Sequence, residues 1–439
     1  MKKLFVYMKG YGRQCVLGPL FKLLEASLEL LVPLVIAAII DRGIAGGDRG
    51  YILRMGLLLA ALGLVGLIFS VTAQYFAADA SVGFVARIKH ALFAHLQSLS
   101  YAELDKLGTS TMITRMTSDM NQLQNGVNLT LRLLLRSPFV VFGAMIMAFT
   151  IDVRAALVFA VAIPVLSVVV FGIMLVSIPL YKKVQSRLDG VLRATRENLN
   201  GVRVLRAFCR EEAEVREFEE KNDALTDAQK FVGRISALMN PLTYVIINAA
   251  ICALIYTGAL RVEAGLLTQG AVIALYNYMS QILVELIKLA NLIITITKAV
   301  ACGNRIASVL EIPAGMEAHP EVSSAVQNGD AVRVTDVSLR YATSGEALEH
   351  ISFSAAPGET VGVIGGTGSG KSSLVNLIPR FYDAASGSVT VDGVDVRAWD
   401  TETLRQKIGV VPQKAVLFRG TVRDNMRWGN PDATDEEIW

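Results

Sequence analysis

Residues 360–373 read TVGVIGGTGSGKSS, and Gly365–Ser372 fit the pattern G-x-x-x-x-G-K-[S/T] completely. Glycines in such a loop let successive backbone N–H groups turn toward a phosphate, because no Cβ stands in the way. Lys371 can bring its charge to the β- and γ-phosphates of a nucleotide, and Ser372 can offer its hydroxyl oxygen to Mg²⁺. The pattern therefore predicts a nucleotide-binding loop. Its expected contacts are Gly365, Gly366, Thr367, Gly368, Ser369, Gly370, Lys371, Ser372 and Ser373.

The residues on either side of the loop strengthen this prediction. The β-branched run Thr360–Ile364 predicts a strand that ends at the loop, and Ser372–Leu377 predicts a helix that ends before Pro379. The N-terminus of that helix would also face the anion. The alternative interpretation, a glycine-rich turn without a ligand, does not require a strand before the loop and a helix after it.

Short strand signals surround the loop and predict an α/β domain. Asp392-Gly393 between two β-branched runs is a hairpin signal. The expected strands are Val332–Val334, Ser338–Tyr341, Ile351–Phe353, Thr360–Ile364, Gly387–Val391, Val394–Val396 and Ile408–Val411, with a short helix over Thr401–Gln406.

The rest of the chain has the composition of a membrane protein. Of its 439 residues 53% are hydrophobic and only 18% charged, against about 25% charged in soluble domains, so a disordered chain and an ordinary cytosolic enzyme are excluded. The formal net charge of +3 gives no support to nucleic-acid binding. Six stretches reach the roughly 20 apolar residues that a membrane span needs: Gln14–Ile40, Ile52–Ala78, Leu133–Ile151, Ala155–Leu180, Pro241–Leu260 and Leu266–Ala299.

Basic residues predict the orientation of these spans. Met1–Arg13 carries four basic residues and no acidic one, and the long loop 181–240 carries twelve Lys and Arg. The loops on the other side carry few, so the basic segments are expected on the cytoplasmic side. We therefore predict a multi-pass protein of the inner or plasma membrane, with its N-terminus and its nucleotide-binding part in the cytoplasm. The first apolar run is expected to be a retained span rather than a cleaved signal peptide.

Polar residues form a stripe inside the predicted spans. Asn277, Gln281 and Glu285 recur at helical spacing in the sixth span, and Asn248 lies in the fifth. Intramembrane polar groups usually face a bundle interior or a watery cavity, so we hypothesise that these four residues line a translocation pathway. Hydrogen bonding between helices is the alternative. In the first span, Lys22, Glu25 and Glu29 could bind a cationic substrate, but local pairing of Lys22 with Glu25 is the favoured interpretation.

Together, six spans, long basic loops and the GGTGSGKSS loop resemble an ATP-binding cassette (ABC) exporter of the bacterial multidrug type. The resemblance covers essentially the whole chain, and its implied cofactors are ATP and Mg²⁺. Tyr341, in SLRYATSGEALEHISFSAAPGE, matches the aromatic that stacks on adenine, and Gln413, in VVPQKAVLFRGTVRDNM, matches the Q-loop glutamine that contacts Mg²⁺ and the attacking water. The plainer interpretations are a strand aromatic for Tyr341 and a loop amide for Gln413. Ser372 and Gln413 are the implied metal contacts.

Two further stretches, LSYAELDKLGTSTMITRMTSDM and ENLNGVRVLRAFCREE, are similar to the intracellular loops of this family. Their tips would be coupling helices near Ser100–Leu107 and Gly201–Arg210, docked on nucleotide-binding domains of a homo- or heterodimer. The resemblance implies a membrane domain over 1–310, a linker over 311–330 and the N-terminal part of a nucleotide-binding domain over 331–439.

The chain also departs from the family pattern, because no signature motif, Walker B strand or switch histidine follows Gln413. We therefore expect a C-terminally truncated chain with an incomplete nucleotide-binding domain, no catalytic base and little ATP hydrolysis on its own. The function implied for the whole protein is ATP-driven export of an amphipathic drug, lipid or peptide by alternating access. The alternative is an ATP-gated membrane regulator or the catalytically degenerate partner in a heterodimeric exporter.

Overall fold

The computed structural model describes residues 1–313, 329–341 and 345–438, so most of the predicted linker 311–330 lies outside the described residues. The chain divides into two compact units. The first comprises Met1–Ala94 and Ser110–Glu311, and the second comprises His95–Thr109 and Ile312–Trp439.

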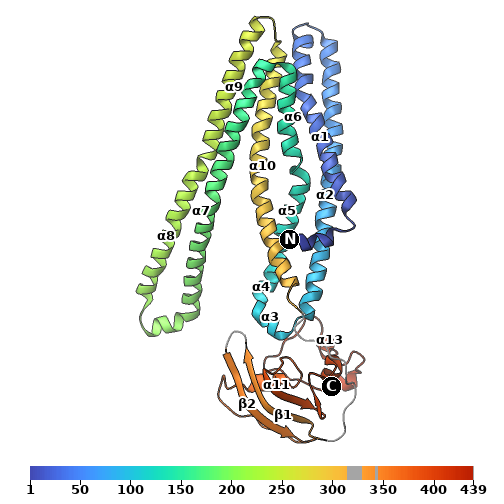
Figure 1. The fold of residues 1–439 in the computed structure, drawn as a ribbon, viewed down its shortest axis with the longest axis vertical. Helices are drawn as coiled ribbons and strands as arrows, with labels where there is room; N and C mark the ends of the chain where they lie inside the picture. Colours follow the sequence, from blue (N-terminus) through green and yellow to red (C-terminus); the bar gives the residue numbers. More distant parts are fainter. Residues whose placement is uncertain (314–328, 342–344, 439) are drawn as a thin grey trace. The chain divides into compact units, whose positions relative to one another are not determined.

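The first unit is entirely helical in its described residues. Its helical elements form long rods that reverse direction at short turns (Figure 1). They are η1 Lys2–Met8, α1 Gly12–Ala38, η2 Ile39–Ile44, α2 Arg49–Ser98, α4 Thr109–Thr114, η3 Arg115–Asp119, α5 Met120–Leu133, α6 Arg136–Ile151, α7 Val153–Ala207, α8 Glu211–Ala237, α9 Met239–Glu263 and α10 Gln269–Leu310.

Six helical stretches of the described chain are long and apolar enough to cross a membrane, which confirms the predicted fold class. They are Gly12–Ile44, Arg49–Ser98, Thr109–Ile151, Val153–Ala207, Glu211–Glu263 and Gln269–Leu310. Five of the predicted spans lie within these stretches, and the sixth helix begins at Gln269 rather than Leu266. The protein is therefore a multi-pass membrane protein.

Several of these helices are much longer than a bilayer requires. An α-helix rises 1.5 Å per residue, so α2 with 50 residues and α7 with 55 are roughly 75 and 80 Å long. The hydrocarbon core is about 30 Å thick. More than half of each helix therefore extends beyond the hydrocarbon core, as expected from the long loops between the predicted spans.

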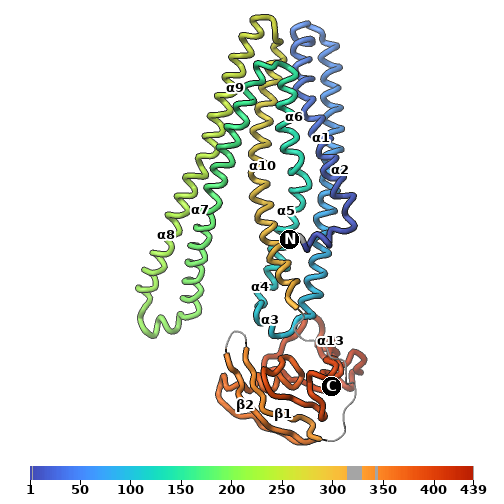
Figure 2. Tube along the Cα trace, viewed as in Figure 1, coloured from blue at the N-terminus to red at the C-terminus, as the bar shows by residue number. Residues whose placement is uncertain are grey.

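Helix α10 forms the centre of the first unit. Its tube runs beside those of α5 and α6 in Figure 2, and it also packs against α1, α7 and α9. Tyr278 and Ile282 on α10 are fully buried. Small residues bring the helices close together: a Cβ on Gly126 of α5 would collide with the methyl group of Ala299 on α10. By contrast, the most apolar window of α2 has no buried residues, as expected for a lipid-facing helix.

The second unit contains a four-stranded antiparallel sheet in its described residues, ordered β2-β1-β3-β4. The strands are β1 Val332–Tyr341, β2 Gly345–Ala355, β3 Ser386–Val391 and β4 Val394–Asp395. The predicted hairpin is confirmed, since Val391 pairs with Val394 around a turn in which Asp392 and Gly393 both have positive φ. The helices are α3 Tyr101–Leu107, α11 Lys371–Leu377, α12 Thr401–Gln406, α13 Val422–Met426 and α14 Asp435–Ile438.

Two of the predicted strands are wrong. Residues Thr360–Ile364 and Ile408–Val411 are not strands in the structure, although α12 between them and the preceding hairpin occurs where predicted. A strand needs a hydrogen-bonding neighbour, and these segments have none among the described residues. Their apolar side chains remain open to solvent, with Ile364 98% and Val411 97% exposed. Local β-propensity alone does not make a strand.

Candidate nucleotide-binding site and polar membrane cavity

The glycine-rich loop leads directly into α11, as the sequence predicts. The ammonium group of Lys371 folds back over the loop, where it donates hydrogen bonds to the carbonyl oxygens of Gly365 at 2.7 Å and Gly366 at 2.6 Å. The amide of Ser369 bonds to the Gly366 carbonyl at 3.3 Å. These contacts hold the positive charge of Lys371 against the backbone of the loop, from where it can reach the phosphates of a nucleotide.

Two glycines in the loop have a backbone that other residues rarely adopt. Gly368 and Gly370 both have φ of +85°. A Cβ on Gly370 would also lie 2.6 Å from the carbonyl oxygen of Ala347 and 2.7 Å from the Leu348 side chain, both on β2. Gly366 has neither constraint, because no atom would lie within 4 Å of its Cβ. The described loop conformation therefore favours glycine at Gly368 and Gly370 but not at Gly366.

The serines after the loop have different surroundings. Ser372 is exposed and has no hydrogen bond among the described residues, so its hydroxyl oxygen is free to serve as a ligand. A hydroxyl oxygen suits Mg²⁺, which prefers hard oxygen donors and keeps most of its other ligands as phosphate and water. Ser373 instead accepts a hydrogen bond from the hydroxyl of Tyr341 at 3.1 Å. The structure thus links the predicted adenine-binding tyrosine to the residue that follows the loop.

Tyr341 belongs to an aromatic cluster that the sequence did not predict. Its ring meets the Tyr382 ring edge-on at 5.2 Å, and Tyr101 of α3 packs against Phe381 at 4.8 Å and Tyr382 at 6.1 Å. The Tyr382 hydroxyl donates to the Asp105 carboxylate at 2.6 Å. Burial, and next the neighbouring Asp105 carboxylate, raise the pKa of Tyr382. Two consecutive aromatics after Pro379-Arg380 were the only sequence signal for this cluster.

The two predicted coupling segments differ in structure. The first forms α3, where the Ser100 side chain accepts a hydrogen bond from the Glu103 amide at 3.4 Å and caps the helix. The second, Gly201–Arg210, is the end of α7 followed by a turn in which Cys209 has positive φ. It does not form a separate short helix.

Gln413, the predicted Q-loop glutamine, has no hydrogen bond to the phosphate loop among the described residues. It lies in an exposed bend and makes no hydrogen bond within the described residues. No contact in this structure links it to Ser372, so its role in metal and water binding stays a prediction.

A cavity of 380 Å³ in the first unit contains three of the four residues predicted for a translocation pathway. Asn277, Gln281 and Glu285 on α10 line it, opposite apolar residues of α1. Asn248 is not part of this cavity; its amide donates to the Tyr244 carbonyl of its own helix at 2.7 Å. The α10 members of the stripe therefore line one cavity and Asn248 on α9 does not, and a role for any of them in a pathway stays a prediction.

Arg136, at the start of α6, binds two carboxylate groups that line this cavity. Its guanidinium donates to Glu285 at 2.7 Å and to Glu29 at 2.6 Å, and the Ser137 hydroxyl donates to Glu285 at 2.8 Å. Both Arg136 and Glu285 are buried. The favoured pairing in the first span is confirmed, since Lys22 lies 2.5 Å from Glu25, which leaves Glu29 to bind Arg136.

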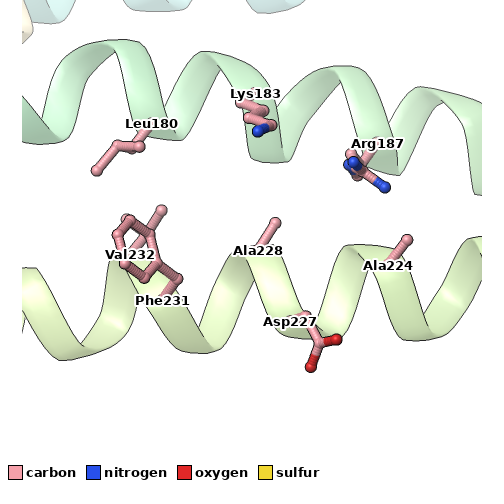
Figure 3. Close-up of a pocket in the computed structure, with 8 residues that line it drawn as sticks. All are labelled: Leu180, Lys183, Arg187, Ala224, Asp227, Ala228, Phe231 and Val232. Carbon is pink, nitrogen blue, oxygen red and sulfur yellow. The ribbon is translucent and has the colours of Figure 1, made fainter.

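A second cavity of 380 Å³ lies between α7 and α8 (Figure 3). Lys183 and Arg187 of α7 border it together with Phe231 of α8, while Asp227 points away from α7 in this view. Neither cation has an ion-pair partner among the described residues. This cavity contains none of the residues predicted for the pathway.

A glycine-rich phosphate loop with its lysine and serine, in one chain with six membrane-spanning helices, defines an ATP-binding membrane protein. Comparison with family models agrees with both halves: residues 15–286 match the ABC transporter transmembrane region, and residues 348–439 match the family described as ABC transporter. The chain belongs to the ABC transporters, and its fused arrangement is that of the exporter type.

Relatives support the same assignment along nearly the whole chain. An uncharacterized ABC transporter ATP-binding protein of Mycobacterium tuberculosis is 36% identical over 441 residues, which cover 99% of this chain and 75% of the relative. A Bacillus subtilis protein of the same description is 32% identical and covers 100% of this chain and 76% of its own length. An ATP-dependent lipid A-core flippase of Desulfotalea psychrophila is 30% identical over 79% of this chain and 60% of its own length.

Proposed function

We propose that this chain is a subunit of a dimeric ATP-driven exporter that moves an amphipathic substrate out of the cytoplasm by alternating access. The observation that carries the proposal is the joint presence of an intact phosphate loop, with Lys371 at its centre, and a polar cavity among membrane helices. A nucleotide site supplies the energy, and a polar cavity inside the apolar region supplies a route for the cargo. The partner would be a second copy or a related subunit.

Different residues of the second unit would contact the phosphates, the adenine and the metal ion of the bound nucleotide. Lys371 holds positive charge over the loop for the β- and γ-phosphates, and the glycine-rich loop Gly365–Gly370 would supply backbone N–H groups to them when a nucleotide binds. Tyr341 offers its ring to adenine, and its contact with Ser373 orients the ring beside the loop. Ser372 and Gln413 would hold Mg²⁺, which supplies charge neutralisation at the phosphates when bound. The general base is not assigned to any of these residues.

The aromatic cluster suggests how the nucleotide site communicates with the helical loops. Tyr341 touches Tyr382, and Tyr382 binds Asp105 of α3, the predicted first coupling helix. A shift of Tyr341 on binding adenine would therefore reach α3 through two direct contacts. The predicted second coupling segment near Gly201–Arg210 would serve the partner subunit. Such segments convert nucleotide-driven closure into movement of the helical bundle.

The proposed orientation in the membrane rests on basic residues, and the proposed substrate class rests on the cavity and on the relatives. Lys183 and Arg187 extend from the predicted cytoplasmic end of the fourth span, which supports a cytoplasmic location for the loops and the nucleotide site in the inner or plasma membrane. The cavity joins apolar and polar walls, which supports an amphipathic drug, lipid or peptide. The similarity to a protein named as a lipid A-core flippase favours a lipid-like molecule among these.

Replacing Lys371 by alanine in the full-length protein tests the proposal. Loss of a charge-assisted contact is expected to weaken ATP binding by roughly 10- to 100-fold and to abolish ATP-dependent substrate movement in proteoliposomes. Lys407→Ala is the matched control, because Lys407 is half-exposed and pairs with Asp392 at the surface. Undiminished transport by Lys371→Ala would refute the assignment. Tight ATP binding without any transport by the wild type would favour the ATP-gated regulator or degenerate heterodimer partner.

A further inference from the structure

The ionic groups beside the membrane cavity form a chain of alternating charge. Glu29 of α1 binds Arg136 of α6 at 2.6 Å, Arg136 binds Glu285 of α10 at 2.7 Å, and Lys288 binds the same Glu285 carboxylate at 2.8 Å. The order is therefore carboxylate, guanidinium, carboxylate, ammonium. Together these four groups have no net charge, and they connect three helices that are far apart in the sequence.

Each of the two middle groups has two partners of opposite charge, and each end group has one. The side chains of Arg136 and Glu285 are 7% and 4% exposed, and each lies between two groups of opposite charge. Glu29 and Lys288 are 41% and 43% exposed, and each has a single partner that it shares with another ion. Both ends border the cavity. The cavity therefore presents one half-neutralised carboxylate and one half-neutralised ammonium group.

The remaining wall of the cavity is suited to an amphiphile. Apolar residues of α1, α6 and α10 form one part of it, and hydrogen-bonding side chains form another. The Oε1 atom of Gln281 is buried without a hydrogen-bond partner among the described residues, and an unpaired buried acceptor favours a ligand that supplies a donor. The apolar residues are Val32, Pro33, Ile36, Val140 and Val284, and the uncharged polar ones are Asn277, Ser280 and Gln281.

Charge balance decides which ligand suits these two ends. A cationic amphiphile would complete the neutralisation of Glu29 but leave Lys288 with only its shared partner Glu285, and an anionic one would do the opposite. A group that carries both charges satisfies both ends and leaves the region neutral, which avoids the cost of an unpaired charge in a low-dielectric site. The cavity volume of 380 Å³ lies within the usual range for ligand sites.

We propose that this cavity binds a zwitterionic amphiphile, with its ammonium group on Glu29 and its phosphate or carboxylate on Lys288. The inference rests on the transport function proposed above and names the substrate class for the same cavity. An ethanolamine phospholipid from the bilayer and a free single-chain zwitterion share this chemistry.

Binding can be measured without ATP on the full-length protein in an uncharged maltoside detergent. Four fluorescent probes with hydrocarbon chains of equal length carry head groups of different charge: a lysophosphatidylethanolamine (zwitterionic), a lysophosphatidic acid (anionic), an alkylamine (cationic) and a monoacylglycerol (uncharged). Fluorescence anisotropy gives the four dissociation constants. The zwitterionic probe is expected to bind at least about 10-fold more tightly than the other three. Equal affinity for all four would overturn the proposal.

Two single variants test each end separately. Glu29→Gln is expected to weaken binding of the zwitterionic and cationic probes by roughly 10- to 100-fold and to leave the affinity for the anionic probe unchanged. Lys288→Gln is expected to weaken binding of the zwitterionic and anionic probes and to leave the affinity for the cationic probe unchanged. Ratios between probes on the same sample do not depend on the folded fraction. Glu25→Gln is the matched control, since Glu25 lies one turn away on α1, pairs with Lys22 and does not line the cavity. An equal loss of all probes would assign Glu29 and Lys288 a structural role only.

Competition experiments distinguish a ligand from the bilayer from a free amphiphile. They also distinguish failure of this inference from failure of the proposed transport function. Displacement of the probe by diacyl phosphatidylethanolamine in nanodiscs supports a bilayer lipid, and displacement by the single-chain form alone supports a free amphiphile. Equal displacement by soluble phosphoethanolamine would refute the requirement for an apolar body. If the charge preference is present but ATP drives no transport, the proposed function fails alone. If transport proceeds without any charge preference, only this inference fails.

Discussion

Alanine substitutions at three glycines of the phosphate loop should weaken nucleotide binding in an order that follows the backbone geometry. Gly366→Ala adds a methyl group to open space at a residue with ordinary φ, so the expected change is within about 0.5 kcal/mol. Gly368→Ala also meets open space, but at φ of +85°. An L-residue in that region costs about 1–2 kcal/mol, which corresponds to roughly 5- to 30-fold in affinity.

Gly370→Ala carries the same backbone cost and a collision as well. Its methyl group would lie 2.6 Å from the carbonyl oxygen of Ala347. That oxygen belongs to the main chain of β2 and is not the end of a flexible side chain, so the loop or the strand must shift. Overpacking of this kind adds about 1–3 kcal/mol. The total of about 2–5 kcal/mol predicts at least a 30-fold loss of affinity.

Titration with a fluorescent ATP analogue on the full-length protein measures this series, and displacement by ATP confirms that the signal is specific. Limited proteolysis of the second unit shows whether each variant keeps its fold. If Gly370→Ala does not fold, Gly368→Ala still carries the test, because its methyl group meets no neighbouring atom. Wild-type affinity in Gly370→Ala and Gly368→Ala, or an equal loss in Gly366→Ala, would refute the described loop conformation.

Three further substitutions probe the second unit. Tyr382→Phe keeps the ring but removes the 2.6 Å hydrogen bond to Asp105, so we expect about 1–2 kcal/mol less stability by chemical denaturation, and no change would contradict that contact. Trp399→Ala removes a fully buried ring, and a loss of about 3–5 kcal/mol should make the unit sensitive to protease; unchanged resistance would show that the ring is not in the core. The hydrogen bond with Asp336 raises the pKa of the exposed His350. The stabilisation from this pair is therefore full below the ordinary histidine pKa and is lost as pH rises through the raised one; Asp336→Asn should abolish that pH dependence of the melting temperature.

Parts of this molecule follow from the sequence because their physical cause is local. The pattern from Gly365 to Ser372 predicts a phosphate loop, since glycine conformations and the positions of Lys371 and Ser372 are set within a few residues. Hydropathy predicts six spans, because a helix satisfies its own backbone hydrogen bonds and needs only a sufficient apolar length. The pairing of Lys22 with Glu25 is similarly local.

Other features depend on contacts between distant residues, and the tertiary structure alone decides them. Thr360–Ile364 has the composition of a strand, yet it forms none, because β-pairing requires a neighbour. Nothing in the sequence near Arg136 indicates its partners, but the packing of α1, α6 and α10 places it between Glu29 and Glu285, two carboxylates that are far apart in the sequence. Asn248 shares the polarity of the α10 stripe but lies outside its cavity. Polarity and spacing define the face of one helix, whereas only packing determines which faces of different helices meet.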